Sequence, residues 1–298
     1  MLKGSIPVIP TPFSLDGSEI LYDRFAAIID NAIQEGAASI MIFGGGGEFY
    51  KLTARERGRL LKEAIQVCKG KIPVVATVTQ HATRNAIQEI EAFQKAGADV
   101  INVMPPSFAA PSGIMIRDHI IELSKVVKVP MMIQYAPALT GSAISNEVFA
   151  QIADSTRNEL YIKAEAVPTG PAITSIMKAT GGRYSVIIGN AGECLYEALD
   201  RGAVAVMPGA AFVKPYCDIM TAFEKGDKDK AFELYMIFLP YLHFIQRHIE
   251  EFVSMEKLVL QQRGLLPNAV CRMPAIYPDN YTSSLLMKIC QHVIHHFY

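Results

Sequence analysis

The segment LYIKAEAVPTG, residues 160–170, places a lysine directly after an apolar run. The three residues before Lys163 are typical of a buried strand, where a charged ammonium group is costly. Burial favours the neutral amine, and a neutral amine can attack a carbonyl carbon to form a Schiff base. A structural interpretation is also open, in which the amine reaches the rim of the protein or pairs with Glu165.

A tyrosine ends another apolar run, PMMIQY, at residues 130–135. If the two runs are neighbouring strands, the hydroxyl of Tyr135 could reach the same place as Lys163. Schiff-base formation passes through a carbinolamine, which needs a group that moves protons, and a phenol can do this. The alternative is a core tyrosine whose hydroxyl has its own hydrogen-bond partner.

Four glycines and a glutamate, GGGGE at residues 44–48, connect an apolar run to a helical pattern. The backbone N–H groups of Gly45, Gly46 and Gly47 are unobstructed by side chains, and the following helix adds its positive end. This combination suits a carboxylate or a phosphate ligand. A flexible turn is the alternative, because a glycine run alone has low specificity.

Eight short apolar runs recur along the chain, and segments of helical periodicity alternate with them. The runs are nearly continuous in valine, isoleucine and methionine, which is typical of parallel strands buried on both faces. They lie at residues 5–11, 39–43, 73–78, 99–104, 130–135, 160–163, 185–189 and 203–208. Helices are predicted between them, for example over 54–68, 83–97 and 192–202.

Eight strands with intervening helices predict an α/β fold, a (β/α)8 TIM barrel over residues 1–223. A doubly wound sheet is the alternative, but no GxGxxG motif follows the first run. Residues 224–298 are predicted to form a helical extension packed on the barrel, with a separately folding domain as the alternative. Active sites of such barrels lie at the C-terminal ends of the strands, where Lys163, Tyr135 and the glycine run all fall.

The composition argues against several classes of function. The chain has 298 residues and a formal net charge of −1, so it has no basic surface of the kind that binds nucleic acid. No apolar stretch reaches the roughly 18–20 residues of a membrane span, and the N-terminus does not resemble a signal peptide. Five scattered cysteines predict reduced thiols and a cytoplasmic protein. The cluster His292, His295 and His296 has no carboxylate or cysteine partner, so no metal site is predicted.

Several segments, taken as an ordered set, resemble the dihydrodipicolinate synthase / N-acetylneuraminate lyase family. They are PVIPTPF, GGGGEFYKLTARER, PVVATV, VMPPSF, QYAPALTG, YIKAE and GNAGE, and the resemblance continues to EKLVLQQRGLLPNAVCRMP. The resemblance implies a Schiff-base enzyme on a (β/α)8 barrel. It also implies no metal or other cofactor, because a covalent imine on Lys163 would activate the substrate.

The resemblance implies roles for individual residues. Lys163 would form the Schiff base, Tyr135 would shuttle protons, and Glu165 would be a second acid/base group. Gly45 and Gly46 would occupy the places of two polar residues that hold the carboxylate of the 2-keto acid.

Three further positions are assigned to the substrate pocket in the same way. Gly189 and Asn190 would line it, and Phe108 stands where the synthase branch has a tyrosine contributed across a dimer interface. Leu139 stands where that branch has an arginine for the carboxylate of its aldehyde substrate. Together with the glycines of the loop, these departures argue against synthase activity.

We therefore expect a class I lyase that acts on a pyruvate-type 2-keto acid. A 2-keto-3-deoxy sugar acid dehydratase or aldolase is favoured, because GGGGEFYKLT and YIKAE are similar to those branches of the family. Dihydrodipicolinate synthase or N-acetylneuraminate lyase activity is an alternative, and a catalytically silent relative that binds a 2-keto acid is another. The expected partners are a small 2-keto acid and other copies of the chain, as a dimer or tetramer, with no membrane and no nucleic acid.

Overall fold

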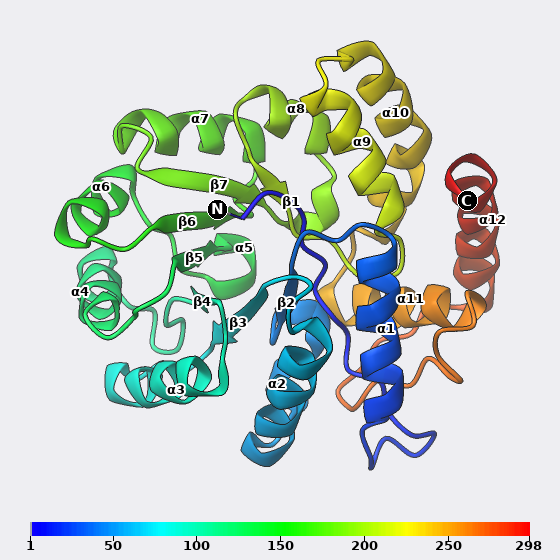
Figure 1. The fold of residues 1–298 in the computed structure, drawn as a ribbon, viewed down its shortest axis with the longest axis horizontal. Helices are drawn as coiled ribbons and strands as arrows, with labels where there is room; N and C mark the ends of the chain where they lie inside the picture. The colour runs from blue at the N-terminus through cyan, green and yellow to red at the C-terminus, as the bar shows by residue number, and fades with distance from the viewer. Residues whose placement is uncertain (1) are drawn as a thin grey trace.

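The computed structural model describes residues 2–298, and its centre is one sheet of eight parallel strands (Figure 1). The strands follow the order β1-β8-β7-β6-β5-β4-β3-β2. Val8 forms parallel bridges with both Met41 and Gly209, which joins the two ends of the sheet. The predicted (β/α)8 barrel is therefore confirmed. The strands are β1 (Gly4–Ser5), β2 (Ile40–Ile42), β3 (Val74–Val78), β4 (Val100–Val103), β5 (Met131–Tyr135), β6 (Leu160–Ala164), β7 (Tyr184–Ile188) and β8 (Ala205–Val206).

Helices follow the strands and form the outer layer (Figure 1). The predicted helices over 54–68 and 83–97 are found almost to the residue. The first begins at a capping box, in which Thr53 and Glu56 satisfy each other's backbone N–H groups. The helices are α1 (Tyr22–Gln34), α2 (Ala54–Cys68), α3 (Thr83–Ala96), α4 (Gly113–Ser124), α5 (Pro137–Thr140), α6 (Asn146–Ser155), α7 (Thr169–Ala179), α8 (Leu195–Asp200) and α9 (Lys214–Glu224), with short 3-10 turns η1 (Gly45–Gly47), η2 (Phe49–Lys51) and η3 (Asn190–Gly192).

The strands are apolar on both faces because both faces are buried. One face contributes to a small cluster inside the barrel that includes Met41, Val75 and Met132. The other face packs against the helices in the larger hydrophobic core, where Ile42, Ile101 and related residues lie. This arrangement explains why the strands read as continuous runs without the alternation of a half-exposed sheet.

Three elements are clearly shorter than predicted, and one of them is the strand expected over 203–208, which is formed only by Ala205–Val206. The first run was expected to be a strand over 5–11, but only Gly4–Ser5 is a strand, because the prolines of this segment have no N–H to donate to a neighbour. The helix expected over 192–202 begins only at Leu195, since Gly192, the last residue of η3, has a positive φ of 75° and interrupts the helical backbone.

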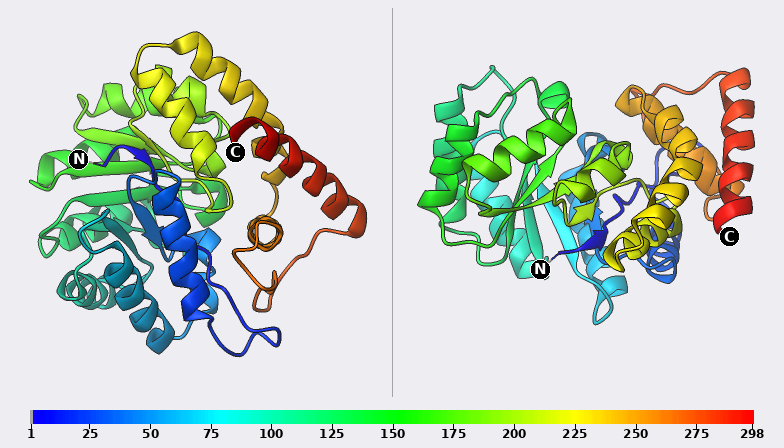
Figure 2. Two further views of the ribbon diagram at one scale, coloured as in Figure 1. Left: turned by 45° about the vertical axis from the view of Figure 1, so that its right-hand side comes forward. Right: turned by 90° about the horizontal axis from the view of Figure 1, so that it is seen from above.

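Three helices follow the barrel, namely α10 (Lys228–Ile245), α11 (Ile249–Gln262) and α12 (Asn280–Phe297). α10 packs along α9 and α12, and α11 contacts η1. Figure 2 shows these helices gathered on one side of the barrel, away from α4 and α6. The boundary predicted between residues 223 and 224 falls in the last turn of α9, shortly before α10 begins.

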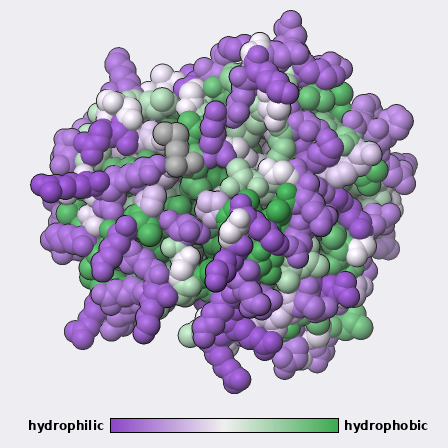
Figure 3. Space-filling model, viewed as in Figure 1, coloured by the Kyte–Doolittle hydropathy of each residue, from purple (hydrophilic) through white to green (hydrophobic). Residues whose placement is uncertain are grey.

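Polar and charged side chains project over much of the face shown in Figure 3, with apolar residues between them. Within residues 2–298, no helix combines the length and the hydropathy needed to cross a membrane.

Candidate active site

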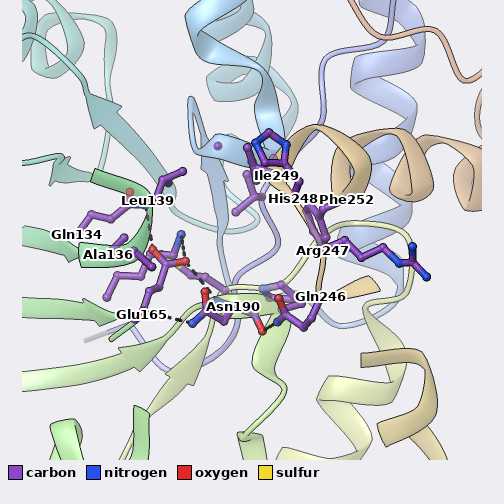
Figure 4. A pocket seen from close by; sticks show the side chains of 18 residues that line it. Gln134, Ala136, Leu139, Glu165, Asn190, Gln246, Arg247, His248, Ile249 and Phe252 are labelled. Carbon is purple, nitrogen blue, oxygen red and sulfur yellow. Dashed lines mark hydrogen bonds and ion pairs between the residues drawn. The ribbon is translucent and has the colours of Figure 1, made fainter. Parts of the chain in front are cut away.

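A cavity of about 420 Å³ opens at the C-terminal ends of the strands. Its wall combines the ends of β5, β6 and β8 with the turns η1 and η3 and with the junction between α10 and α11 (Figure 4). The lining residues are Val8, Gly45, Gly46, Gln134, Ala136, Ala138, Leu139, Lys163, Glu165, Asn190, Ala191, Met207, Pro208, Gln246, Arg247, His248, Ile249 and Phe252.

Lys163 lies in β6 and reaches this cavity from inside the barrel. Its side chain is only 5% exposed, and its Nζ lies 3.3 Å from Oε1 of Glu165. Among the residues that the structure describes, Glu165 is the one charged partner of Lys163. The arrangement fits both interpretations of the sequence, since the amine is paired and also lines a cavity that can hold a ligand.

The carboxylate of Glu165 is fixed by its surroundings. Gln134 donates from Nε2 to Oε2 of Glu165 over 3.0 Å, and the backbone N–H of Asn190 donates to Oε1 over 3.3 Å. A Cβ atom at Gly189 would lie 2.2 Å from Oε1, so only glycine leaves room for the carboxylate. Figure 4 shows Gln134, Glu165 and Asn190 meeting on one side of the cavity.

The glycine loop forms another part of the wall, and the structure explains its composition. A Cβ at Gly46 would lie 3.3 Å from Cε1 of Phe252, and one at Gly45 would lie 3.3 Å from Cδ1 of Ile249. The loop is therefore free of side chains because α11 packs directly on it. The first N–H groups of a helical turn have no acceptor within the turn, so those of η1 can bind an anion in the cavity.

Buried charges hold the loop in place from behind. Glu48 directly follows η1 with a left-handed φ of 57° and is fully buried. Its carboxylate accepts from Nζ of Lys257 in α11, from Nζ of Lys51 over 3.0 Å and from the backbone N–H of Arg272 over 3.2 Å. The glycine loop is thus tied to α11 and to the segment that follows it.

The structure does not place Tyr135 in the cavity. In the β5–β6 register, Gln134 is opposite Lys163 and Tyr135 is opposite Ala164, so Gln134 faces the cavity and Tyr135 faces the helices. The Tyr135 ring packs edge-on against Phe149 at a centroid distance of 5.1 Å, and burial raises its pKa. The prediction that its hydroxyl reaches the barrel mouth beside Lys163 is wrong, because adjacent strand residues point to opposite faces.

Three predicted substrate contacts also lie outside the cavity wall. Phe108 is 82% exposed, on the loop between β4 and α4. Gly47 is buried behind the wall, where its carbonyl accepts from the hydroxyl of Thr11 over 2.7 Å. Gly189 does not line the cavity itself but makes room for Glu165. Of the predicted pocket residues, Gly45, Gly46 and Asn190 do line the cavity.

The sequence prediction missed Gln134 and the residues contributed by the C-terminal helices. Gln246, His248 and Phe252 lie across the cavity from Glu165. The side chain of Gln246 also donates to the backbone oxygen of Asn190, which ties this segment to η3. A polar residue in the apolar run 130–135 was the available signal for Gln134; no local pattern marks the other three.

Metal ligands are not grouped in the cavity. Across residues 2–298, no three His, Cys, Asp or Glu side chains are arranged to hold a metal ion. The rings of His292 and His296 are neighbours, with centroids 4.3 Å apart, on the C-terminal helix α12.

The fold and the cavity define a (β/α)8 enzyme with a buried lysine at a strand end. Residues 1–293 match the model of the dihydrodipicolinate synthetase family, so the chain belongs to this family of lyases. The resemblance seen in the sequence is thereby confirmed.

Relatives within the family have different activities in their names. The chain is 25% identical over 287 residues to an L-2-keto-3-deoxyarabonate dehydratase of Azospirillum brasilense, covering 93% of this chain and 90% of that protein. It is also 25% identical over 299 residues to a 4-hydroxy-tetrahydrodipicolinate synthase of Fervidobacterium nodosum, covering 98% and 99%. Among solved structures, the pyruvate complex of YagE from E. coli K12 is similar, with a TM-score of 0.90, 25% identity and 99% coverage of both chains.

Proposed function

We propose that this protein forms a Schiff base between Lys163 and a 2-keto acid, and that it acts as a dehydratase or an aldolase on a 2-keto-3-deoxy sugar acid. The observation that carries the proposal is the position of Lys163. Its amine is buried in the wall of a cavity, has Glu165 as a proton acceptor at 3.3 Å, and shares the cavity with the open end of η1.

The geometry suggests how a 2-keto acid would bind. Its carboxylate would accept hydrogen bonds from the N–H groups of Gly45 and Gly46, while the Lys163 amine attacks C2. The protonated imine then withdraws electrons from C3. Loss of a C3 proton followed by departure of a β-hydroxyl gives dehydration, and breakage of the C3–C4 bond gives retro-aldol cleavage.

The far wall of the cavity supports a hydroxylated substrate. Gln246 and His248 offer hydrogen-bonding groups there, and Leu139 and Phe252 add apolar surface. This combination suits a chain of carbon atoms that carries hydroxyl groups. The relative from Azospirillum brasilense is named for such a substrate, although the equally identical relative from Fervidobacterium nodosum is named as a synthase. The preference for the dehydratase therefore rests on the cavity wall.

The proposal includes a cytoplasmic homo-oligomer. Phe108, Met115 and Val167 are apolar and 82%, 61% and 79% exposed, and a second copy of the chain would shield such side chains from water. Analytical ultracentrifugation of the purified protein tests this part. A single species at the monomer mass across the micromolar range would contradict it.

The first experiment is borohydride trapping with pyruvate, followed by intact-mass and peptide mass spectrometry. The expected result is one adduct on Lys163, which Lys163→Ala abolishes. Lys62→Ala is the matched control, because this lysine is exposed on α2, and it should leave the adduct unchanged. A folded wild-type protein without an adduct would favour the catalytically silent alternative.

A second experiment separates the two reactions. The protein is incubated with L-2-keto-3-deoxyarabonate and other 2-keto-3-deoxy acids, and pyruvate release is followed with lactate dehydrogenase and NADH. Cleavage releases pyruvate, whereas dehydration consumes the acid without releasing it. Consumption of none of these acids, together with trapping of pyruvate, would point to one of the other activities of the family.

A further inference from the structure

We propose that Gln134 is a positioning residue that aims Glu165 at the reacting carbon, so that this carboxylate takes the proton from C3 of the imine. The inference rests on the proposed function, because it concerns the imine that Lys163 would form. It gives Glu165 the proton-transfer role for which Tyr135 is wrongly placed.

Gln134 connects directly to the reacting pair. It is the residue of β5 directly opposite Lys163, and both side chains line the cavity. The Gln134 amide donates to Oε2 of Glu165 over 3.0 Å, while Oε1 of the same carboxylate lies 3.3 Å from Nζ of Lys163. One oxygen of Glu165 is therefore held by Gln134, and the other is left facing the amine.

A chain of polar side chains inside the barrel fixes the orientation of the Gln134 amide. Nδ2 of Asn102, in β4, donates to Oε1 of Gln134 over 3.1 Å and to the Thr77 hydroxyl oxygen over 3.2 Å. Because Oε1 of Gln134 is engaged by this donor, its NH2 group points at Glu165. A flipped amide would set its oxygen against the carboxylate and its NH2 group against the NH2 group of Asn102.

This polar chain has an energetic cost. Asn102 is fully buried, and its Oδ1 has no hydrogen-bond partner among the described residues. A buried carbonyl oxygen without a partner destabilises the folded protein, because it has lost its hydrogen bonds to water. Neighbouring positions inside the barrel hold apolar side chains such as Met41 and Val75, which have no such cost. A costly polar chain that ends on Glu165 is better explained by positioning than by packing.

The proposed step balances without a further reactant. Glu165 takes one proton from the Lys163 ammonium group and the free amine adds to C2 of the 2-keto acid. The carbinolamine hydroxyl then leaves as water with this proton, which gives the protonated imine. Glu165 then takes a proton from C3, the C–H electron pair forms the C2–C3 double bond, and the imine π pair moves onto nitrogen. In a sugar acid, the nitrogen lone pair then restores the C2–N double bond, the C2–C3 π pair becomes a C3–C4 double bond, and the β-hydroxyl leaves as water with the proton that Glu165 took from C3. Pyruvate has no such group, so its enamine can only take a proton back at C3.

Pyruvate therefore allows the step to be measured without knowing the true substrate. In D2O, each cycle of proton removal and return replaces a methyl hydrogen of pyruvate by deuterium, which proton NMR detects. For Gln134→Met, we expect kcat for exchange to fall about 10- to 100-fold, because the general base is misplaced. KM for pyruvate should stay within about twofold, and borohydride should still trap the adduct on Lys163.

A second variant tests the orientation of the amide itself. Asn102→Leu removes the donor that holds Gln134, yet Asn102 touches neither Glu165 nor the cavity. Exchange should fall about three- to tenfold with the adduct retained, because the amide of Gln134 is then free to turn. This variant also keeps the proposal testable if Gln134→Met does not fold. Tyr135→Phe is the matched control on the same strand, and its exchange rate should equal that of the wild type.

The outcomes separate this inference from the proposed function. Wild-type exchange rates in both folded variants, with the adduct retained, would overturn the positioning role and leave the Schiff base intact. If the wild type forms the adduct but exchanges no deuterium, the positioning role is likewise overturned and the Schiff base is retained. Loss of the adduct itself in Gln134→Met would place Gln134 in imine formation, which also overturns the proposal. No wild-type adduct at all would refute the proposed function and this inference with it.

Discussion

Two of the buried lysine–glutamate pairs, Lys257 with Glu48 and Lys163 with Glu165, differ in the surroundings of their lysine. Lys257 and Glu48 are completely buried. Lys257 also donates to the backbone oxygen of Val270 over 2.8 Å and lies 4.4 Å from the centroid of the Phe13 ring. Glu48 accepts two further hydrogen bonds, from Lys51 and from the backbone of Arg272, and neither Lys257 nor Glu48 lines the cavity.

The pair in the cavity is different. Lys163 and Glu165 have side chains 5% and 12% exposed, and both line the cavity. The amine of Lys163 has one charged partner among the described residues, and it makes none of the additional contacts that Lys257 makes. A pair enclosed by further partners holds segments together, whereas a lysine with one charged partner in a cavity wall can react with a ligand. The two pairs should therefore respond to mutation in opposite ways.

The largest effect is expected for Lys163→Ala. Catalytic turnover should fall by at least about three orders of magnitude, because the nucleophile is removed. The free energy of unfolding should change little, since Glu165 keeps its hydrogen bonds from Gln134 and Asn190. Chemical denaturation and activity are measured on the same preparation. Large destabilisation with activity retained would mean that Lys163 has a structural role and is not the nucleophile.

Lys257→Met should have the opposite signature. Removal of one partner from a buried pair is expected to lower the free energy of unfolding by about 3 kcal/mol, which is the lower end of the usual range because Lys51 remains beside Glu48. Urea unfolding measures this. The double variant Lys257→Met with Glu48→Leu should recover part of the loss, since no uncompensated charge remains. Equal losses in the single and double variants would argue against the pair as the cause.

The salt bridge of Arg272 with Glu56 is a second structural ion pair, and its contribution to stability can be measured by pH. Arg272 donates two hydrogen bonds to this carboxylate, over 2.9 and 2.6 Å, and they lower the Glu56 pKa to about 2. A carboxyl group whose pKa is lower in the folded state stabilises the fold above its unfolded pKa. This stability is lost as the pH falls through 4 toward 2.

Glu56→Gln should therefore lower the free energy of unfolding at pH 7 by about 1–3 kcal/mol and by much less near pH 2. Thermal unfolding across pH 2 to 7 compares the variant with the wild type. A difference that stays constant over this range would show that the charge of Glu56 is not responsible.

The glycine loop is related to both pairs, because it lines the same cavity as Lys163 and Glu165 and is held in place by Glu48 and Lys257. Gly46→Val should raise KM for pyruvate exchange about tenfold, since the added Cβ would lie 3.3 Å from Phe252 and an apolar side chain cannot hydrogen-bond a carboxylate. Phe252→Ala in the same chain should restore part of the binding. An unchanged KM for Gly46→Val would remove the loop from the carboxylate site.

The fold was predictable because its signals are local. Continuous apolar runs marked the strands, and helical periodicity marked the helices between them, for example over 54–68 and 83–97. The position of Lys163 at a strand end then followed from the barrel itself. These features depend on a few neighbouring residues, so a single sequence is enough to find them.

The details of the site depend on information that a single sequence does not contain. A shift of one residue along a strand reverses the face of a side chain, and this decides between Gln134 and Tyr135. The apolar run 130–135 has no alternation that would have revealed which residue faces inward. His248 and Phe252 enter the site only because α11 packs on η1, a contact between segments about two hundred residues apart.

The smallest effect is expected for Tyr135→Phe, which changes a residue close to the cavity pair that does not line the cavity. The hydroxyl of Tyr135 points away from the cavity, where its ring packs on Phe149, so exchange and turnover should change by less than about twofold. The matched measurement is Glu165→Gln, which removes the carboxylate that pairs with Lys163 and should slow exchange by about two orders of magnitude or more. If Tyr135→Phe instead matched the loss in Glu165→Gln, the phenol would have to reach the imine. β5 would then need a different register beside Lys163 in the working enzyme.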